Sequence, residues 1–230
     1  MAETLAPARR LRLAKARPPR DSTAGILTAG LAVATALVAA QIPANLVDFG
    51  VYHYPFALLN PNNEGGLFAW IGGIMIAVAG AVCLLQFRVA SERGRYLLAG
   101  LLLGVVAVEN RARIDEQSFH RAVVYGPLFA ALLVTLIAIS WQWAPAPRWA
   151  VWAGIASLLC SLALHKLAPH VLTHYGYGPG DWPWEVKVSL KESSELFGWA
   201  LICAALLAVA SRRSGPLVGA SRPPVAEASD

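Results

Sequence analysis

Charged side chains are scarce in this chain of 230 residues, where Asp, Glu, Lys and Arg make up 14% of the sequence. A soluble domain carries roughly 25% charged residues, so the composition excludes an ordinary soluble protein. Hydrophobic residues make up 57% instead, and the mean hydropathy is +0.51. We therefore expect an all-α fold, an integral membrane helical bundle surrounded by the lipid bilayer.

Cysteine is also rare, and the common motifs of soluble enzymes are missing. The three cysteines are an odd number, lie inside apolar stretches and form no C-x-x-C pair, so the sequence offers neither a disulfide framework nor a closed zinc motif. The sequence contains no phosphate-binding glycine loop, G-x-S-x-G turn, H-E-x-x-H helix or haem-attachment motif. These absences exclude the commonest soluble chemistries.

Six apolar stretches approach or reach the roughly 20 residues that a helix needs to cross a bilayer. They cover residues 24–42, 67–87, 96–108, 123–143, 149–168 and 190–210. Pro169 is expected to end or kink the fifth helix. Ser189 and Glu192 fit a capping box that would start the sixth. The sequence thus predicts six transmembrane helices.

Basic residues are distributed unevenly over the ends of these stretches. With the N-terminus in the cytoplasm, 13 of the 19 lysines and arginines lie on the cytoplasmic side, which predicts that both termini are cytoplasmic. We expect residues 1–22 to be a disordered basic arm on anionic lipid headgroups, residues 23–212 the transmembrane domain and residues 213–230 a disordered tail. The expected location is the plasma (inner) membrane of a bacterium, with no nucleic-acid partner.

Acidic residues and histidines concentrate on the opposite, outer side. This topology places all five histidines and nine of the fourteen acidic residues there. The densest part is the run 109–120, which continues the third apolar stretch without a break. Charged side chains at membrane depth are costly and usually face a bundle interior or a water-filled cavity, so this concentration indicates a polar site.

Four residues of that run fall on one helix face. Glu109, Arg113, Glu116 and His120 are spaced by four, three and four positions, which aligns them along a helix. Arg113 is the natural partner of Glu109, and Glu116 with His120 resembles a pair of metal ligands. The alternative interpretation is a solvated helix end with intrahelical ion pairs.

Other segments add residues to this predicted site. His165 ends the fifth apolar stretch, and Glu195 lies one turn inside the sixth. We therefore assign the metal or polar site to Glu109, Glu116, His120, His165 and Glu195. Supporting roles are expected for Arg113, Lys191, Glu192, His170, His174, Asp48 and His53. The histidines could equally be interfacial hydrogen-bonding residues, and Asp48 and His53 ordinary residues of the first outer loop.

Mixed carboxylate and imidazole ligands suit a divalent metal, here iron, manganese or zinc. Such a metal could support hydrolysis or oxidation of a lipid-like or periplasmic substrate. A proton- or metal-coupled transporter is the first alternative, because intramembrane glutamates and histidines also form proton relays. A non-catalytic membrane scaffold or assembly subunit is the second. The sequence identifies no catalytic residue.

Overall fold

The computed structural model describes residues 22–52, 66–112 and 119–214, and these residues are almost entirely helical. Seven helices are described, in the order α1 (Ser22–Tyr52), α2 (Leu67–Gln86), α3 (Arg93–Ala112), α4 (Phe119–Ser140), α5 (Pro145–Lys166), α6 (Ala168–His174) and α7 (Trp182–Ser214). No strand occurs among the described residues. The prediction of an all-α helical bundle is confirmed.

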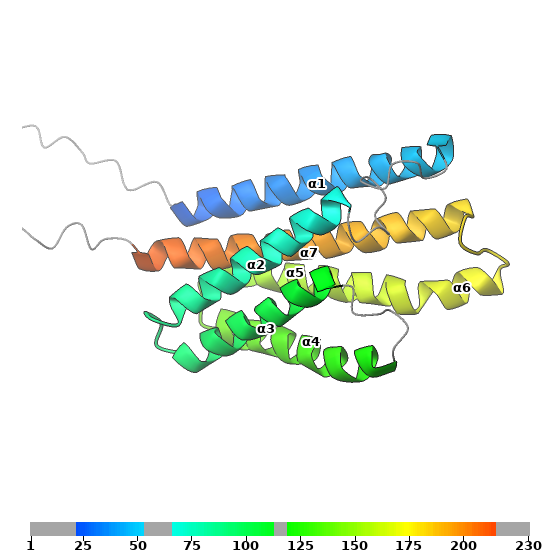
Figure 1. Cartoon of the computed structure of the whole chain (residues 1–230). Helices are drawn as coiled ribbons and strands as arrows, with labels where there is room; N and C mark the ends of the chain where they lie inside the picture. The colour runs from blue at the N-terminus through cyan, green and yellow to red at the C-terminus, as the bar shows by residue number, and fades with distance from the viewer. Residues whose placement is uncertain (1–21, 53–65, 113–118, 215–230) are drawn as a thin grey trace, which may run out of the picture.

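The six long helices run side by side in alternating directions (Figure 1). As a result, α1 begins and α7 ends at the same end of the bundle, which we call the tail end. We call the opposite end, where α1 ends and α7 begins, the far end. The prediction that both termini lie in the cytoplasm stays a prediction. The predictions for the arm and the tail fall largely on residues 1–21 and 215–230, outside the described residues.

Four helical segments are long and apolar enough to cross a membrane. They are Thr23–Val51, Leu67–Gln86, Pro145–His174 and Trp182–Arg212. Helix α4 contributes a shorter apolar stretch, Tyr125–Ser140. Large hydrophobic side chains such as Leu31, Leu101 and Val134 are about half exposed or more on the outside of the bundle, as expected for surfaces that face lipid. The chain is therefore a membrane-type helical bundle, and six crossings remain a prediction.

Helix α7 is the central helix of the bundle. It packs along α1 and α5 and also contacts α2, and most of its second half is buried. Small residues allow these close approaches: Gly30 of α1 lies against Ala204, and Gly154 of α5 lies against Gly198. The hydrophobic core continues from Ile202 and its neighbours into α2, α3 and α4.

Two helices are longer than the hydropathy pattern predicts. Helix α1 continues ten residues past position 42, so Asp48 lies inside a helix and not in the predicted outer loop. Helix α7 begins at Trp182, eight residues before the predicted start, so the capping box at Ser189 and Glu192 is wrong. Hydropathy treats each segment alone, whereas the polar residues of α1 and α7 face one another.

The starts of α6 and α7 have identifiable causes. Helix α5 ends at Lys166 and α6 starts at Ala168, so Pro169 occupies the first turn of a new helix. The predicted break at Pro169 is confirmed. Before α7, the backbone N–H of Gly178 donates to the Asp181 carboxylate at 2.7 Å, and Gly180 adopts φ 93°, a conformation that glycine tolerates readily. The turn built on Asp181 thus sets the direction in which α7 enters the bundle.

Candidate functional site

A buried strip of polar residues lies between α1 and α7 in the far half of the bundle. We call it the α1–α7 seam; its members are Gln41, Asn45 and Asp48 of α1 and Glu185, Ser189 and Ser193 of α7. Spacings of three or four residues bring such side chains onto one face of each helix. Because the two helices are antiparallel neighbours, the two polar faces meet.

Hydrogen bonds join the seam across the two helices. The Asn45 side-chain amide donates to Ser189 Oγ, and Ser193 Oγ donates to Gln41 Oε1 at 3.3 Å. Ser189 Oγ in turn donates to the Glu185 carbonyl oxygen at 3.0 Å. The buried Oδ1 of Asn45 accepts no hydrogen bond from the described residues. An unpaired buried acceptor is unfavourable, so a water molecule bound at this point would stabilise the seam.

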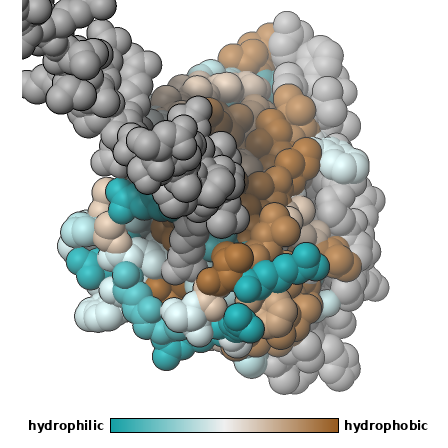
Figure 2. Space-filling view, turned by 90° about the vertical axis from the view of Figure 1, so that its left-hand side faces the viewer, coloured by the Kyte–Doolittle hydropathy of each residue, from teal (hydrophilic) through white to brown (hydrophobic). Residues whose placement is uncertain are grey.

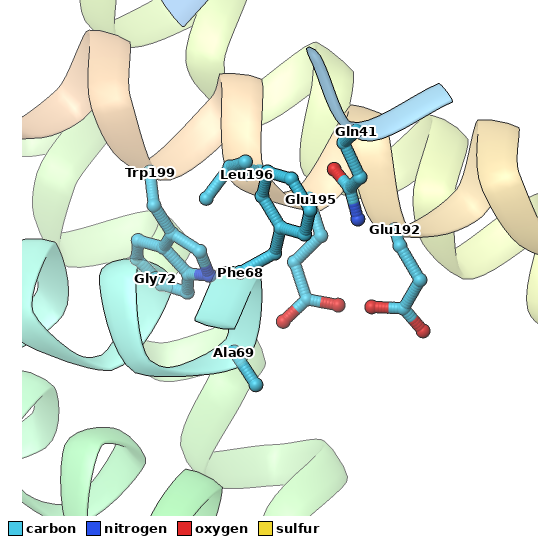
Figure 3. A pocket seen from close by; sticks show the side chains of 8 residues that line it. All are labelled: Gln41, Phe68, Ala69, Gly72, Glu192, Glu195, Leu196 and Trp199. Atoms are coloured by element: carbon cyan, nitrogen blue, oxygen red, sulfur yellow. The ribbon is translucent and has the colours of Figure 1, made fainter. Parts of the chain in front are cut away.

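The seam ends at a small pocket between α1, α2 and α7. Its lining residues are Gln41, Phe68, Ala69, Gly72, Glu192, Glu195, Leu196 and Trp199. Figure 3 shows the carboxylates of Glu192 and Glu195 side by side, with the Gln41 amide turned toward them. The hollow measures about 50 Å³, which is room for a few water molecules or one small ion.

Glu195 is the innermost carboxylate of this pocket. The Trp199 side chain hydrogen-bonds to it, and Glu192, Lys191 and Glu109 are close enough to act on it electrostatically. Lys191 Nζ lies 2.6 Å from Glu192 Oε1, so this lysine already has an acidic partner. Within the described part of the chain, no cation forms an ion pair with Glu195. The pocket therefore favours the binding of a positive charge.

The opposite half of the α1–α7 contact is mostly apolar, apart from the hydrogen bond that Arg212 Nε donates to Thr23 Oγ1 near the tail end. Beyond Trp199, α7 presents the buried side chains of Leu201, Ile202, Cys203, Ala204, Ala205 and Leu206. Helix α1 meets this segment through Gly30, and a Cβ atom added there would collide with Ala204. The buried polar residues of the seam thus lie on the far-end side of the pocket, and mostly apolar residues lie on its tail-end side.

The described residues of the predicted site lie in different places. Glu109 acts electrostatically on Glu195, and the assignment of both to one site stays a prediction. His165, His170 and His174 are exposed and line no part of the pocket. Among the residues that the structure describes, no group of three or more His, Cys, Asp or Glu could hold a metal ion.

The rest of the predicted site cannot be compared with the structure. Arg113, Glu116 and His53 lie outside the described residues, and of His120 only the backbone, in the first turn of α4, is described. The predicted pairing of Glu116 with His120 therefore stays a prediction.

Glu192 and Glu195 of the pocket lining and Asp48 of the seam were predicted from the sequence, but Gln41 of the pocket and Asn45 of the seam were not. Gln41, Asn45 and Asp48 repeat at spacings of four and three, the same rule that identifies the face of Glu109. This signal was available but was hidden by the assumption that the first helix ends near position 42. Phe68 and Trp199 carry no such signal, because only the packing of α2 against α7 makes them pocket residues.

Comparisons with protein-family models, with curated proteins and with solved structures gave no match. The chemistry of the pocket is therefore the basis for the functional proposal. The relevant properties of the pocket are its paired carboxylates, its small size and the buried polar seam on its far-end side.

Proposed function

We propose that this chain is an ion-coupled membrane carrier that binds a proton or a small cation at Glu195. The observation that carries the proposal is the position of two adjacent carboxylates, those of Glu192 and Glu195, in a small hollow at the inner end of the α1–α7 seam. Lys191 forms an ion pair with Glu192 and acts on Glu195 electrostatically without an ion pair between the two. A bound positive charge would balance the Glu195 carboxylate more fully.

The volume of the pocket and the type of its polar atoms limit the ligands that it can bind. A hollow of about 50 Å³ accommodates an ion or a few waters but not a lipid chain. Its polar atoms are carboxylate and amide oxygens together with N–H donors of Gln41 and Trp199. Oxygen ligands suit protons and hard cations better than soft metals.

The depth of Glu195 in the bundle and the polar seam beside it favour a transport function. Glu195 lies 13 residues into α7, roughly 20 Å along the helix at 1.5 Å per residue, which is close to the middle of a bilayer-spanning segment. Carriers commonly bind their ions near the membrane midplane and expose them to one side at a time. Buried polar residues lie on the far-end side of Glu195 and mostly apolar residues on its tail-end side, an asymmetry expected of a carrier that admits its ion from the far end.

A hydrophobic carbodiimide tests whether Glu195 takes up a proton in an apolar setting. The reagent adds to a protonated carboxyl, so we expect peptide mapping of purified protein to place the modification on Glu195. A competing cation that occupies the pocket should slow the reaction. Glu195→Gln should abolish it, whereas Glu92→Gln at the tail end should leave it unchanged. Equal labelling of wild type and Glu195→Gln would contradict the proposed site.

A divalent metal centre with hydrolytic or oxidative activity is the second candidate. It is favoured by the approach of Glu109 to Glu195, because Glu109 begins the helix face that leads to Glu116 and His120 in the sequence. We expect metal analysis of purified protein to find iron, manganese or zinc near one ion per chain, and Glu116→Ala or His120→Ala to remove it. Retention in His174→Ala serves as the control. Metal-free wild type that cannot be reloaded would contradict this candidate.

A further inference from the structure

Three tryptophans gather at the tail end, where α4 turns into α5. The Trp152 ring lies 5.3 Å from Trp141 and 5.0 Å from Trp149, measured between ring centroids. Trp141 is 62% exposed and Trp149 59% exposed. Indole rings favour the boundary between hydrocarbon and headgroups, so this cluster marks the depth of lipid headgroups.

An arginine lies within this tryptophan cluster. The Arg148 guanidinium carbon is 5.7 Å from the Trp152 ring centroid, and the Nε atom is buried without a hydrogen-bond acceptor among the described residues. The nearby acidic residue of this end, Glu92, already interacts with Arg95 at 2.7 Å and with Gln142. Arg148 is therefore held in place by an aromatic ring and not by a carboxylate.

The start of α5 cannot replace Arg148 as an anion site. Free backbone N–H groups at a helix N-terminus often bind anions, but Pro145 and Pro147 occupy the first turn of α5 and proline has no N–H. The Arg148 backbone N–H already donates to the Ala144 carbonyl oxygen at 3.3 Å. Binding of an anion at this turn therefore depends on the guanidinium group.

Figure 2 views the bundle from the tail end, where hydrophilic residues lie beside hydrophobic surface. Arg88 and Arg93 flank the turn between α2 and α3, and Arg212 lies near the end of α7. The combination of exposed indoles and an arginine without a carboxylate partner among the described residues fits a negatively charged amphiphile. A soluble anion would use the charge but not the indoles.

We infer that the α4–α5 turn binds the headgroup of an anionic phospholipid. Arg148 pairs with the phosphodiester, which a guanidinium recognises through two parallel hydrogen bonds. Trp141 and Trp149 contact the glycerol and the upper acyl chains. This site is separate from the basic arm and does not depend on the proposed ion-coupled transport.

The test measures lipid retention by native mass spectrometry of the full chain in detergent, titrated with phosphatidylglycerol or phosphatidylcholine of the same acyl chains. We expect wild type to retain phosphatidylglycerol preferentially. Arg148→Gln should weaken that retention by about tenfold, the factor for roughly one charge-assisted hydrogen bond. The matched control, Arg88→Gln, removes the same charge from the same end and should change retention less than twofold. The basic arm is present in every variant and contributes equally.

Two further measurements separate this site from general charge effects. Trp149→Leu keeps the charge but should lower retention severalfold, and Arg148→Lys should restore only part of the wild-type affinity because a lysine cannot bind the phosphodiester through two parallel hydrogen bonds. Equal losses in Arg148→Gln and Arg88→Gln would overturn the inference. So would displacement of the lipid by inorganic phosphate alone at millimolar concentration, which would identify a soluble anion as the ligand.

Discussion

Replacing Gly198 with leucine is expected to destabilise the folded protein strongly. A Cβ atom at Gly198 would lie 2.8 Å from the Gly154 carbonyl oxygen and 2.9 Å from Leu158 Cγ. The first contact is with the backbone of α5, which cannot rotate away as a side chain can. Overpacking of this kind typically costs about 1–3 kcal/mol, and a leucine at a helix crossing belongs at the upper end of that range.

The measurement is thermal unfolding in detergent, followed by tryptophan fluorescence, together with the yield of monodisperse protein. Gly104→Leu is the matched control, because a Cβ atom at Gly104 of α3 meets nothing within 4 Å. We expect Gly104→Leu to unfold near the wild-type temperature and Gly198→Leu to unfold well below it. If the two variants unfold at the same temperature, the close α5–α7 packing is wrong.

The sequence was sufficient to predict the class of fold, because apolar stretches of this length and number are typical of helices that cross a bilayer. It was not sufficient to predict the ends of α1 and α7. Residues 182–189 are polar enough to be taken for a loop, yet Glu185 and Ser189 are buried. Their polar atoms are compatible with a helix in the membrane because Asn45 and its neighbours on α1 face them. Pairing between helices is not visible in the hydropathy of either one.

Residues of the candidate site could be predicted where they were charged and lay well inside a membrane-spanning segment. Glu195 was singled out in this way and lines the pocket, while its grouping with Glu109 in one site stays a prediction. Residues contributed by packing, such as Phe68 and Trp199, could not be found, because their role depends on the contact between α2 and α7. The histidines were grouped with the glutamates because both lie on the same predicted side of the membrane. In the described structure, the side chains of His165, His170 and His174 are exposed and lie outside the pocket. Two residues at the same depth in the membrane need not be in contact with one another.

Substituting Glu195 by glutamine is expected to slow ion movement through the protein strongly. Glutamine keeps the shape and most of the hydrogen bonding of glutamate, so the fold should survive, but it cannot take up a proton or balance a cation. The loss of that charge interaction in an apolar site should lower the rate by about tenfold or more, which corresponds to about 1.4 kcal/mol in the barrier. Glu92→Gln, at the tail end and away from the pocket, should transport at the wild-type rate.

Ion flux into liposomes that contain the purified protein tests the central claim most directly. A pH-sensitive dye inside the vesicles reports protons, and cation-sensitive dyes report sodium and divalent metals, while a potassium diffusion potential provides the driving force. The account predicts flux of protons or of one of these cations in wild type and in Glu92→Gln, and flux at the level of protein-free liposomes in Glu195→Gln. Wild-type flux in Glu195→Gln, or no flux of any tested ion in wild type, would contradict it.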